Sequence, residues 1–172
     1  MKNGKLLIGA MCMGSTCRSP QGYGTLKQKL VERGIPAVVR SFGMIPELLA
    51  PVAERPVHLQ RAQPHSITIM AERGIDINDH VPEHVTKVNI KDYDLVVVMD
   101  PNAYRILTED VGFPKDKAVL LNAPDGVYNP FDASLTDLLA QDLGRYRKTA
   151  AQLDEIMPSV IEEPSAFKFP VV

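Results

Sequence analysis

The sequence has no tryptophan, only two cysteines and no excess of basic residues. Lys and Arg number 19 against 21 Asp and Glu, so the chain lacks the basic surface of proteins that bind nucleic acid or anionic membranes. Its longest apolar runs, residues 6–13 and 95–99, are far shorter than the roughly 20 residues of a membrane helix. Two cysteines five positions apart exclude a secreted disulfide framework. These absences predict a cytoplasmic protein with neither nucleic acid nor a membrane as its partner.

What the chain does contain is the composition of an ordinary globular protein. Hydrophobic residues make up 45% and charged residues 23%, which excludes a disordered or fibrous chain. A length of 172 residues is enough to bury one hydrophobic core. We therefore expect residues 1–172 to form a single domain.

Short apolar runs alternate along the chain with segments of helical periodicity. The runs with strand character are residues 5–11, 37–42, 94–99 and 118–121. The segments with helical character are residues 19–33, 66–72, 101–110 and 133–157. Ser19 is expected to cap the first of these helices and Pro20 to open it. The alternation predicts an α/β fold with an open, four-stranded parallel sheet.

Two further segments are rich in proline. Residues 43–64 contain prolines at positions 46, 51, 56 and 64, which predicts a long loop insertion with one short helix. Residues 158–172 contain prolines at positions 158, 164 and 170, and we expect them to form a C-terminal tail on the surface. The sequence does not indicate what either segment does.

The stretch most informative about chemistry is MCMGSTCRSP, residues 11–20, which directly follows the first predicted strand. In a tight loop between a strand and a helix, successive backbone N–H groups converge, and the helix end adds partial positive charge. Such a loop binds anions like phosphate. The residues expected to bind substrate in this way are Met13, Gly14, Ser15, Thr16, Cys17 and Ser19.

Two side chains of this stretch suit phosphate chemistry. Arg18 carries a planar fork of donors that matches two oxygens of a tetrahedral anion. Cys12 lies in the same positive field, which favours the thiolate, and comparable cysteines have pKa values of about 3.5–7.5. Ser19 can hydrogen-bond the sulfur, so Cys12 can attack phosphorus in line. A cysteine here could equally be a small buried apolar residue, but the preceding strand, Gly14 and Pro20 together favour the anion site.

The pattern C-x-G-x-x-C-R-S-P resembles that of the low-molecular-weight protein tyrosine phosphatase family, whose fold also serves thioredoxin-coupled arsenate reductases. Three later segments are similar to that family as well: Ser41-Phe42-Gly43, residues 74–80 (GIDINDH) and residues 94–100, which end in Met-Asp. The likeness extends over most of the chain, from Lys5 to about Met157.

The resemblance implies a flavodoxin-like, three-layer α/β/α fold and a cysteine-dependent phosphomonoesterase that uses no metal or cofactor. Cys12 would attack phosphorus, Arg18 and the loop amides would bind the oxyanion, a carboxylic acid would protonate the leaving oxygen, and water would hydrolyse the cysteinyl-phosphate. Its substrate would be a phosphorylated protein or a small aryl phosphate. The resemblance also implies a polar network among positions 15, 19, 41 and 80.

The sequence departs from the family pattern at three places. Asn129 stands where the family has the acidic residue that protonates the leaving group, and an amide cannot donate a proton at neutral pH. Asp125 and Asp132, on the same loop, could replace that acid, or could simply cap the next helix and solvate the loop. Ser15 replaces a bracing asparagine. Residues 44–47 (MIPE) replace an aromatic wall of the substrate cleft.

One aromatic wall could still come from Phe131 or Tyr128, and Asn129 could contact substrate. Two other functions stay open. The chain could be a phosphate-binding or phosphoprotein-binding relative without turnover, or an arsenate reductase coupled to an external small thiol, because no cysteine follows Cys17. The spacing of Cys12 and Cys17 also predicts that an oxidised Cys12 is trapped as a disulfide with Cys17.

Overall fold

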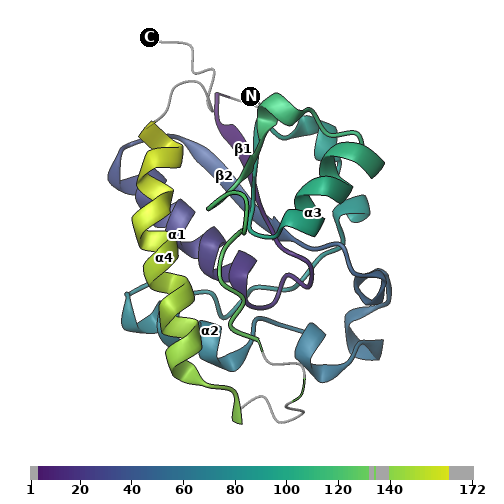
Figure 1. Cartoon of the computed structure of the whole chain (residues 1–172), viewed down its shortest axis with the longest axis vertical. Helices are drawn as coiled ribbons and strands as arrows, with labels where there is room; N and C mark the ends of the chain where they lie inside the picture. The colour runs from purple at the N-terminus through teal and green to yellow at the C-terminus, as the bar shows by residue number, and fades with distance from the viewer. Residues whose placement is uncertain (1–3, 132–133, 135–139, 163–172) are drawn as a thin grey trace.

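The computed structural model describes residues 4–131, 134 and 140–162. Four parallel strands form one open sheet in the order β2-β1-β3-β4 (Figure 1). The strands are β1 (Leu6–Met11), β2 (Ala37–Phe42), β3 (Leu95–Val98) and β4 (Ala118–Leu120). The predicted fold class is confirmed. The order of the strands reverses between β1 and β3, and open α/β sheets bind their ligands outside the strand ends at such a point.

Helices cover both faces of the sheet, with α1 and α4 on one side and α3 on the other (Figure 1). The four α-helices are α1 (Arg18–Glu32), α2 (Pro64–Glu72), α3 (Pro101–Arg105) and α4 (Leu143–Glu162). A π-helical turn, Ile106–Asp110, continues α3. Short 3₁₀ turns lie at Pro46–Leu49, Val52–Glu54, Val57–Leu59, Val85–Lys87, Ile90–Asp92 and Lys115–Lys117. Within the described residues, no helix is long and apolar enough to cross a membrane.

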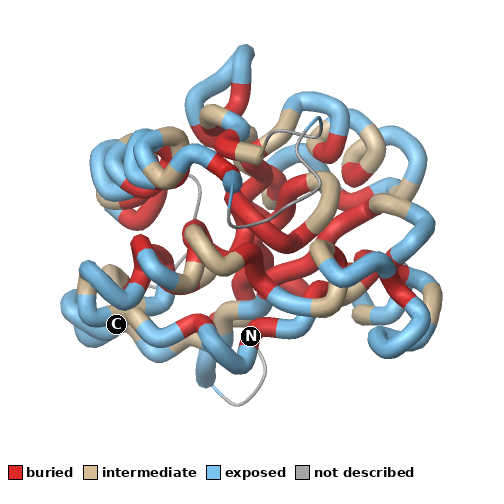
Figure 2. The backbone as a smooth tube through the Cα atoms, turned by 90° about the horizontal axis from the view of Figure 1, so that it is seen from below, coloured by how far each residue is buried: buried red, intermediate tan, exposed pale blue. Residues whose placement is uncertain are grey.

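The apolar run of β3 is buried on both faces of the sheet. Leu95 and Val97 pack toward α1 and α4, whereas Val96 and Val98 pack toward α3. Successive side chains of a strand point to opposite faces, so one strand contributes to two core layers. Figure 2 shows the buried residues concentrated along this central sheet, with exposed residues on the outer turns. The sheet thereby holds the carboxyl ends of β1 and β3 in a fixed relation.

The predicted cap of α1 is wrong. The helix begins at Arg18 with Cys17 as its N-cap residue, so Ser19 and Pro20 lie inside the first turn. Pro20 is tolerated there because the first four N–H groups of a helix have no intrahelical partner. The Ser19 hydroxyl is consequently free to point into the preceding loop.

The predicted bounds of the last helix are also wrong at both ends. The helix begins at Leu143, and Asp142 Oδ1 accepts a hydrogen bond from Gly144 N at 2.7 Å, which ends the helix on that side. Residues 132–133 and 135–139 lie outside the described part of the chain. At the other end α4 continues through Pro158 to Glu162, and Val160 and Ile161 extend its buried stripe. Residues 158–162 therefore belong to the helix and not to the predicted surface tail, whose remaining residues, 163–172, lie outside the described part of the chain.

The proline-rich insertion contains three 3₁₀ turns rather than one short helix. It is organised around Arg55, whose side chain is buried. Its guanidinium donates hydrogen bonds to Ala50 O (2.9 Å), Leu48 O (3.0 Å) and Pro82 O (2.6 Å). The insertion is therefore a fixed structure, and its last part lies against the loop that follows β1.

Candidate active site

The loop of residues 12–18 joins the carboxyl end of β1 to the first turn of α1, at the predicted position. Cys12 is only 3% exposed, and its Sγ lies 3.3 Å from Ser19 Oγ. Ser19 reaches the sulfur because it lies in the first helical turn. No acidic residue is present in that turn, so the positive end of the helix is available to an anion. We call residues 12–18 the phosphate loop.

The backbone of the phosphate loop is held from outside through its carbonyl groups. Its carbonyls accept hydrogen bonds as follows: Met13 O from Met44 N (2.8 Å), Ser15 O from His80 Nε2 (2.8 Å), Thr16 O from Gln63 N (2.8 Å) and Cys17 O from Ser66 Oγ (3.3 Å). In a planar trans peptide the carbonyl and the next N–H point in opposite directions. Outward carbonyls leave the following N–H groups on the opposite side of each peptide, the arrangement that an anion-binding loop needs.

Gly43 allows the insertion to approach the phosphate loop this closely. A Cβ atom at Gly43 would lie 2.5 Å from Met13 O and 3.0 Å from Ser15 N. Both neighbours are backbone atoms, so neither can move without shifting the loop. The close approach explains the glycine of the Ser41-Phe42-Gly43 segment.

Positions 15, 19, 41 and 80 meet behind the loop, where the resemblance placed them. Ser41 Oγ donates to Ser19 Oγ (3.0 Å), and Ser15 Oγ lies 3.1 Å from Ser41 Oγ and 3.4 Å from Ser19 Oγ. Burial lowers the pKa of His80, so the ring is neutral at neutral pH, and its Nε2–H donates to Ser15 O. Ser15 itself has a φ of 53°, a left-handed conformation that is uncommon for serine.

Arg18 is buried and is held by the opposite wall of the site. Its NH2 group pairs with Asp100 Oδ2 at 2.8 Å, and NH1 donates to Met99 O (3.1 Å) and Val127 O (3.3 Å). Asp100 Oδ1 accepts from the N–H of Asn102 at 2.9 Å and so caps α3. The sequence alone did not indicate a role for Asp100. The Asp-Pro pair after β3 is a signal for a helix cap, but not for the contact with Arg18.

Cys17 is unsuited to be the nucleophile. Burial, together with the nearby Cys12, raises the pKa of the Cys17 thiol to about 12. Its sulfur lies 3.7 Å from both Thr16 Oγ1 and Tyr146 Oη. Cys17 thus remains a thiol at neutral pH, whereas Cys12 has the serine partner expected for a reactive sulfur.

The predicted acid segment, residues 125–132, is only partly brought to the site. Asn129 is exposed, and its Oδ1 accepts from the backbone N–H of Phe131 at 3.3 Å. Asp125 is exposed on the same side and lines, with Arg18 and Asn129, a cavity of about 740 Å³. Asp132 lies outside the described residues. Neither amide nor carboxylate of this segment has a recorded contact with Cys12 among the described residues.

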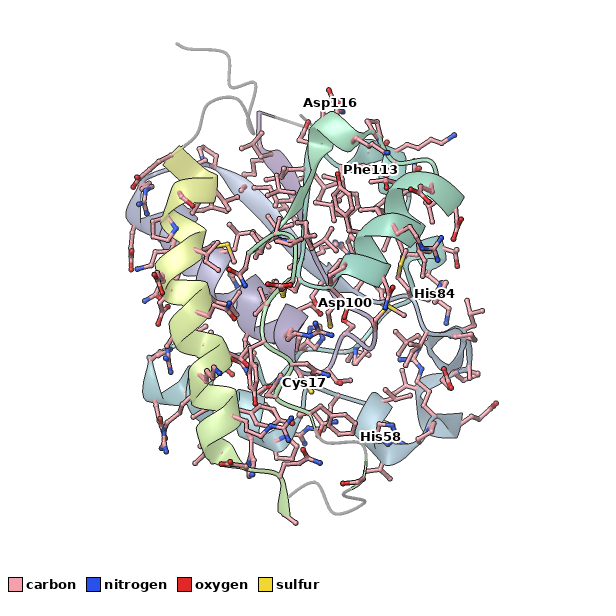
Figure 3. The ribbon with its side chains drawn as sticks, in the orientation of Figure 1. Cys17, His58, His84, Asp100, Phe113 and Asp116 are labelled. Carbon is pink, nitrogen blue, oxygen red and sulfur yellow. The ribbon has the colours of Figure 1, made fainter. Side chains whose placement is uncertain are left out.

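The rim of the site is built by two segments far apart in the sequence. Leu59 and Ile45, from the insertion, lie 3.9 Å and 3.8 Å from the position of a Cβ atom at Gly14. The ring of Phe131 stacks on His58, with centroids 5.9 Å apart and planes inclined by 20°. In Figure 3, Asp100, Cys17 and His58 follow one another down the middle of the molecule.

Tyr128, the other predicted wall, turns toward α4 instead. Lys148 Nζ lies 4.3 Å from the centroid of its ring, and its hydroxyl accepts from Arg145 Nε at 3.2 Å. Among the described residues, no three His, Cys, Asp or Glu side chains stand together as a metal site would require.

Comparison with known proteins agrees with this geometry. Residues 7–164 match the family described as low molecular weight phosphotyrosine protein phosphatase. The chain belongs to this family. Its phosphatase relatives support the predicted class of enzyme, a cysteine-dependent hydrolase of phosphomonoesters, which is confirmed at that level.

Several members of the low molecular weight phosphatase family are similar over most of the chain. A protein-arginine-phosphatase of Bacillus subtilis is 26% identical over 158 residues, which cover 89% of this chain and 93% of that protein. The crystal structure of a low molecular weight protein tyrosine phosphatase from T. tengcongensis has a TM-score of 0.73 at 25% identity, covering 92% of this chain and 99% of that one. Wzb of Vibrio vulnificus, in complex with benzylphosphonate, shares the fold, with a TM-score of 0.70 at 21% identity over 91% of this chain and 97% of its own.

Proposed function

We propose that this phosphatase hydrolyses phosphate groups of proteins, or small aryl phosphates, with Cys12 as its nucleophile. The observation that carries the proposal is the phosphate loop, in which four carbonyls are anchored from outside and the Cys12 sulfur lies 3.3 Å from Ser19 Oγ. Arg18 ends the loop as the first residue of α1, and its guanidinium is held by Asp100. A tetrahedral anion on this loop would face the sulfur.

The first step forms an S–P bond at Cys12 while the bond from phosphorus to the leaving group breaks. The leaving oxygen takes the electron pair and must be stabilised or protonated. Ser19 Oγ, 3.3 Å from the sulfur, stabilises the thiolate before attack and again when water breaks the S–P bond. Arg18 and the loop amides bind the three equatorial oxygens of the transferred group.

The leaving group must be able to depart, and the need for a proton at this step limits which phosphate esters the enzyme can hydrolyse. With an amide at position 129, the enzyme favours leaving groups that depart without a proton. Aryl phosphates, including phosphotyrosine, release a phenolate and meet this condition better than phosphoserine does. If an acid contributes, it is Asp125, which lines the cavity shared with Arg18, or Asp132.

A phosphorylated arginine is a second candidate substrate. Its guanidinium group already carries the proton, so breaking the P–N bond releases a neutral guanidine without an acid from the enzyme. Asn129 is the observation that favours this substrate, and the similarity to the Bacillus subtilis protein-arginine-phosphatase also favours it. A cytoplasmic location is also proposed, because both cysteines are free thiols and a reducing compartment preserves Cys12.

The test is rapid-mixing hydrolysis of p-nitrophenyl phosphate between about pH 5 and 8, a range that includes neutral pH. The wild-type enzyme should give a burst of nitrophenolate, and Cys12→Ser should lower turnover by roughly 10⁴-fold or more. Cys17→Ser should retain far more activity than Cys12→Ser. Phosphate binding without a burst would contradict the proposal and would indicate a phosphate-binding relative without turnover. Phosphotyrosine and phosphoarginine peptides then separate the two substrate classes.

A further inference from the structure

The ring of Phe131 is already covered in the free protein. One face stacks on His58, with ring centroids 5.9 Å apart. The rest of the side chain packs against the buried cluster that contains Cys17, Ile69 and Tyr146. Phe131 thus contacts the cluster that contains Cys17 of the phosphate loop, whereas the ring of Tyr128 turns toward α4. An aryl group that stacks on Phe131 therefore encounters the imidazole of His58.

The backbone that carries His58 is tied to the phosphate loop. Gln63 Nε2 donates to His58 O at 2.9 Å, and Gln63 N donates to Thr16 O at 2.8 Å. Leu59, the next residue, is buried and packs over Gly14. The Cα of His58 is thus fixed close to the site.

The imidazole of His58 is much less constrained than its backbone. The side chain is half-buried, and among the described residues its imidazole makes no hydrogen bond or ion pair and stacks on Phe131. A half-exposed side chain changes rotamer on the picosecond to nanosecond timescale. The ring can therefore leave Phe131 without any movement of the phosphate loop.

We propose that His58 is a specificity-determining residue that competes with aromatic substrates for the face of Phe131. An aryl phosphate must displace the imidazole before its ring can stack, whereas a slender aliphatic phosphate enters without doing so. The inference rests on the proposed phosphate site and adds a discrimination among the ligands of that site. Because an aromatic pair contributes about 0.5–1.5 kcal/mol, the effect on affinity is roughly two- to tenfold.

The test uses two phosphonates, which share the anionic head of a phosphate ester and are not hydrolysed at their C–P bond. Calorimetry measures the affinities of phenylphosphonate, methylphosphonate and inorganic phosphate for the wild-type chain, His58→Ala and His58→Phe. The alanine variant should bind phenylphosphonate roughly two- to tenfold more tightly, with the other two affinities unchanged. The phenylalanine variant retains a ring on Phe131 and should keep the wild-type preference.

Val57→Ala is the matched control, because Val57 belongs to the same 3₁₀ turn and is 72% exposed. It should change none of the three affinities. A weaker affinity of His58→Ala for phenylphosphonate, or an equal change for all three ligands, overturns the inference. If the folded wild-type protein binds none of them, the proposed function itself is wrong and this inference falls with it.

Discussion

The phosphate loop and the segment 125–131 meet at the same site, but they are held in different ways. In the phosphate loop four carbonyl groups are fixed by neighbouring elements, and Ser15 and Thr16 are buried. In the opposite segment Asp125 and Asn129 are exposed, and the amide of Asn129 accepts a bond from its own turn. The groups proposed to bind an anion are thus built into the core, whereas those that would serve the leaving group are not.

The contrast indicates which half of the chemistry the structure specifies. Anion binding needs several N–H groups aimed at one point, and a shift of one of them weakens the whole set. Proton donation needs one carboxyl group, which can be lost while the fold and the anion site remain. If Asn129 stands in the place of that carboxyl group, as the resemblance implies, binding and attack by Cys12 should tolerate the change better than departure of a poor leaving group.

After the loss of Cys12 itself, the largest effect is expected from disturbing the anchored half. Gly43→Ala would place a Cβ atom 2.5 Å from Met13 O, so the phosphate loop must shift. A displacement of about 1 Å at an active site lowers the rate roughly 10²-fold. We expect kcat/KM for p-nitrophenyl phosphate to fall by about that factor, with a smaller change in thermal stability.

Gly144→Ala controls for the loss of a glycine as such. An added Cβ there would lie 3.1 Å from Asp142 Oδ1, at the start of α4 and outside the phosphate loop. Activity should stay at the wild-type level in this variant. Wild-type kcat/KM in Gly43→Ala would mean that the phosphate loop does not depend on this close approach.

The same contrast explains what the sequence could and could not predict. Apolar runs predicted the four strands, and the cysteine-arginine loop was placed correctly because it depends on local order. The pairing of Arg18 with Asp100 spans 82 positions, and the stack of Phe131 on His58 joins two irregular segments. Neither has a periodic signal. The start of α4 depends on one side chain, Asp142, so helical periodicity alone extended the helix too far.

A smaller effect, of opposite sign, is expected from Asn129→Asp. The side chain is exposed, and a carboxylate can still accept the hydrogen bond from Phe131 N, so the turn should be kept. A general acid contributes about 10²–10⁴-fold when well placed. For a group introduced at the rim we expect a gain of about tenfold on phenyl phosphate, and little gain on p-nitrophenyl phosphate.

The dependence of the rate on the pKa of the leaving group is the quantity to compare. It should be steep in the wild type and shallower in Asn129→Asp. Asp125→Asn, in the wild-type background, tests whether Asp125 already supplies a proton. If it does, the dependence of the rate on the pKa of the leaving group should become steeper in this variant. An unchanged slope in Asn129→Asp would show that this segment does not face the leaving group.

The smallest effect concerns the pH dependence of the anchoring itself. Burial lowers the pKa of His80 below its ordinary value of 6.5, so the unfolded chain binds this proton more readily than the folded chain does. The stabilising contribution of the neutral ring is present above about pH 6.5 and is lost as the pH falls toward the lowered value.

In His80→Gln the amide can still donate to Ser15 O, but it does not titrate. The temperature of thermal unfolding should therefore fall less between about pH 7 and 5 in this variant than in the wild type. Parallel pH profiles for the two proteins would mean that the bond from His80 to the phosphate loop survives protonation, and that the anchored half of the site is insensitive to acid.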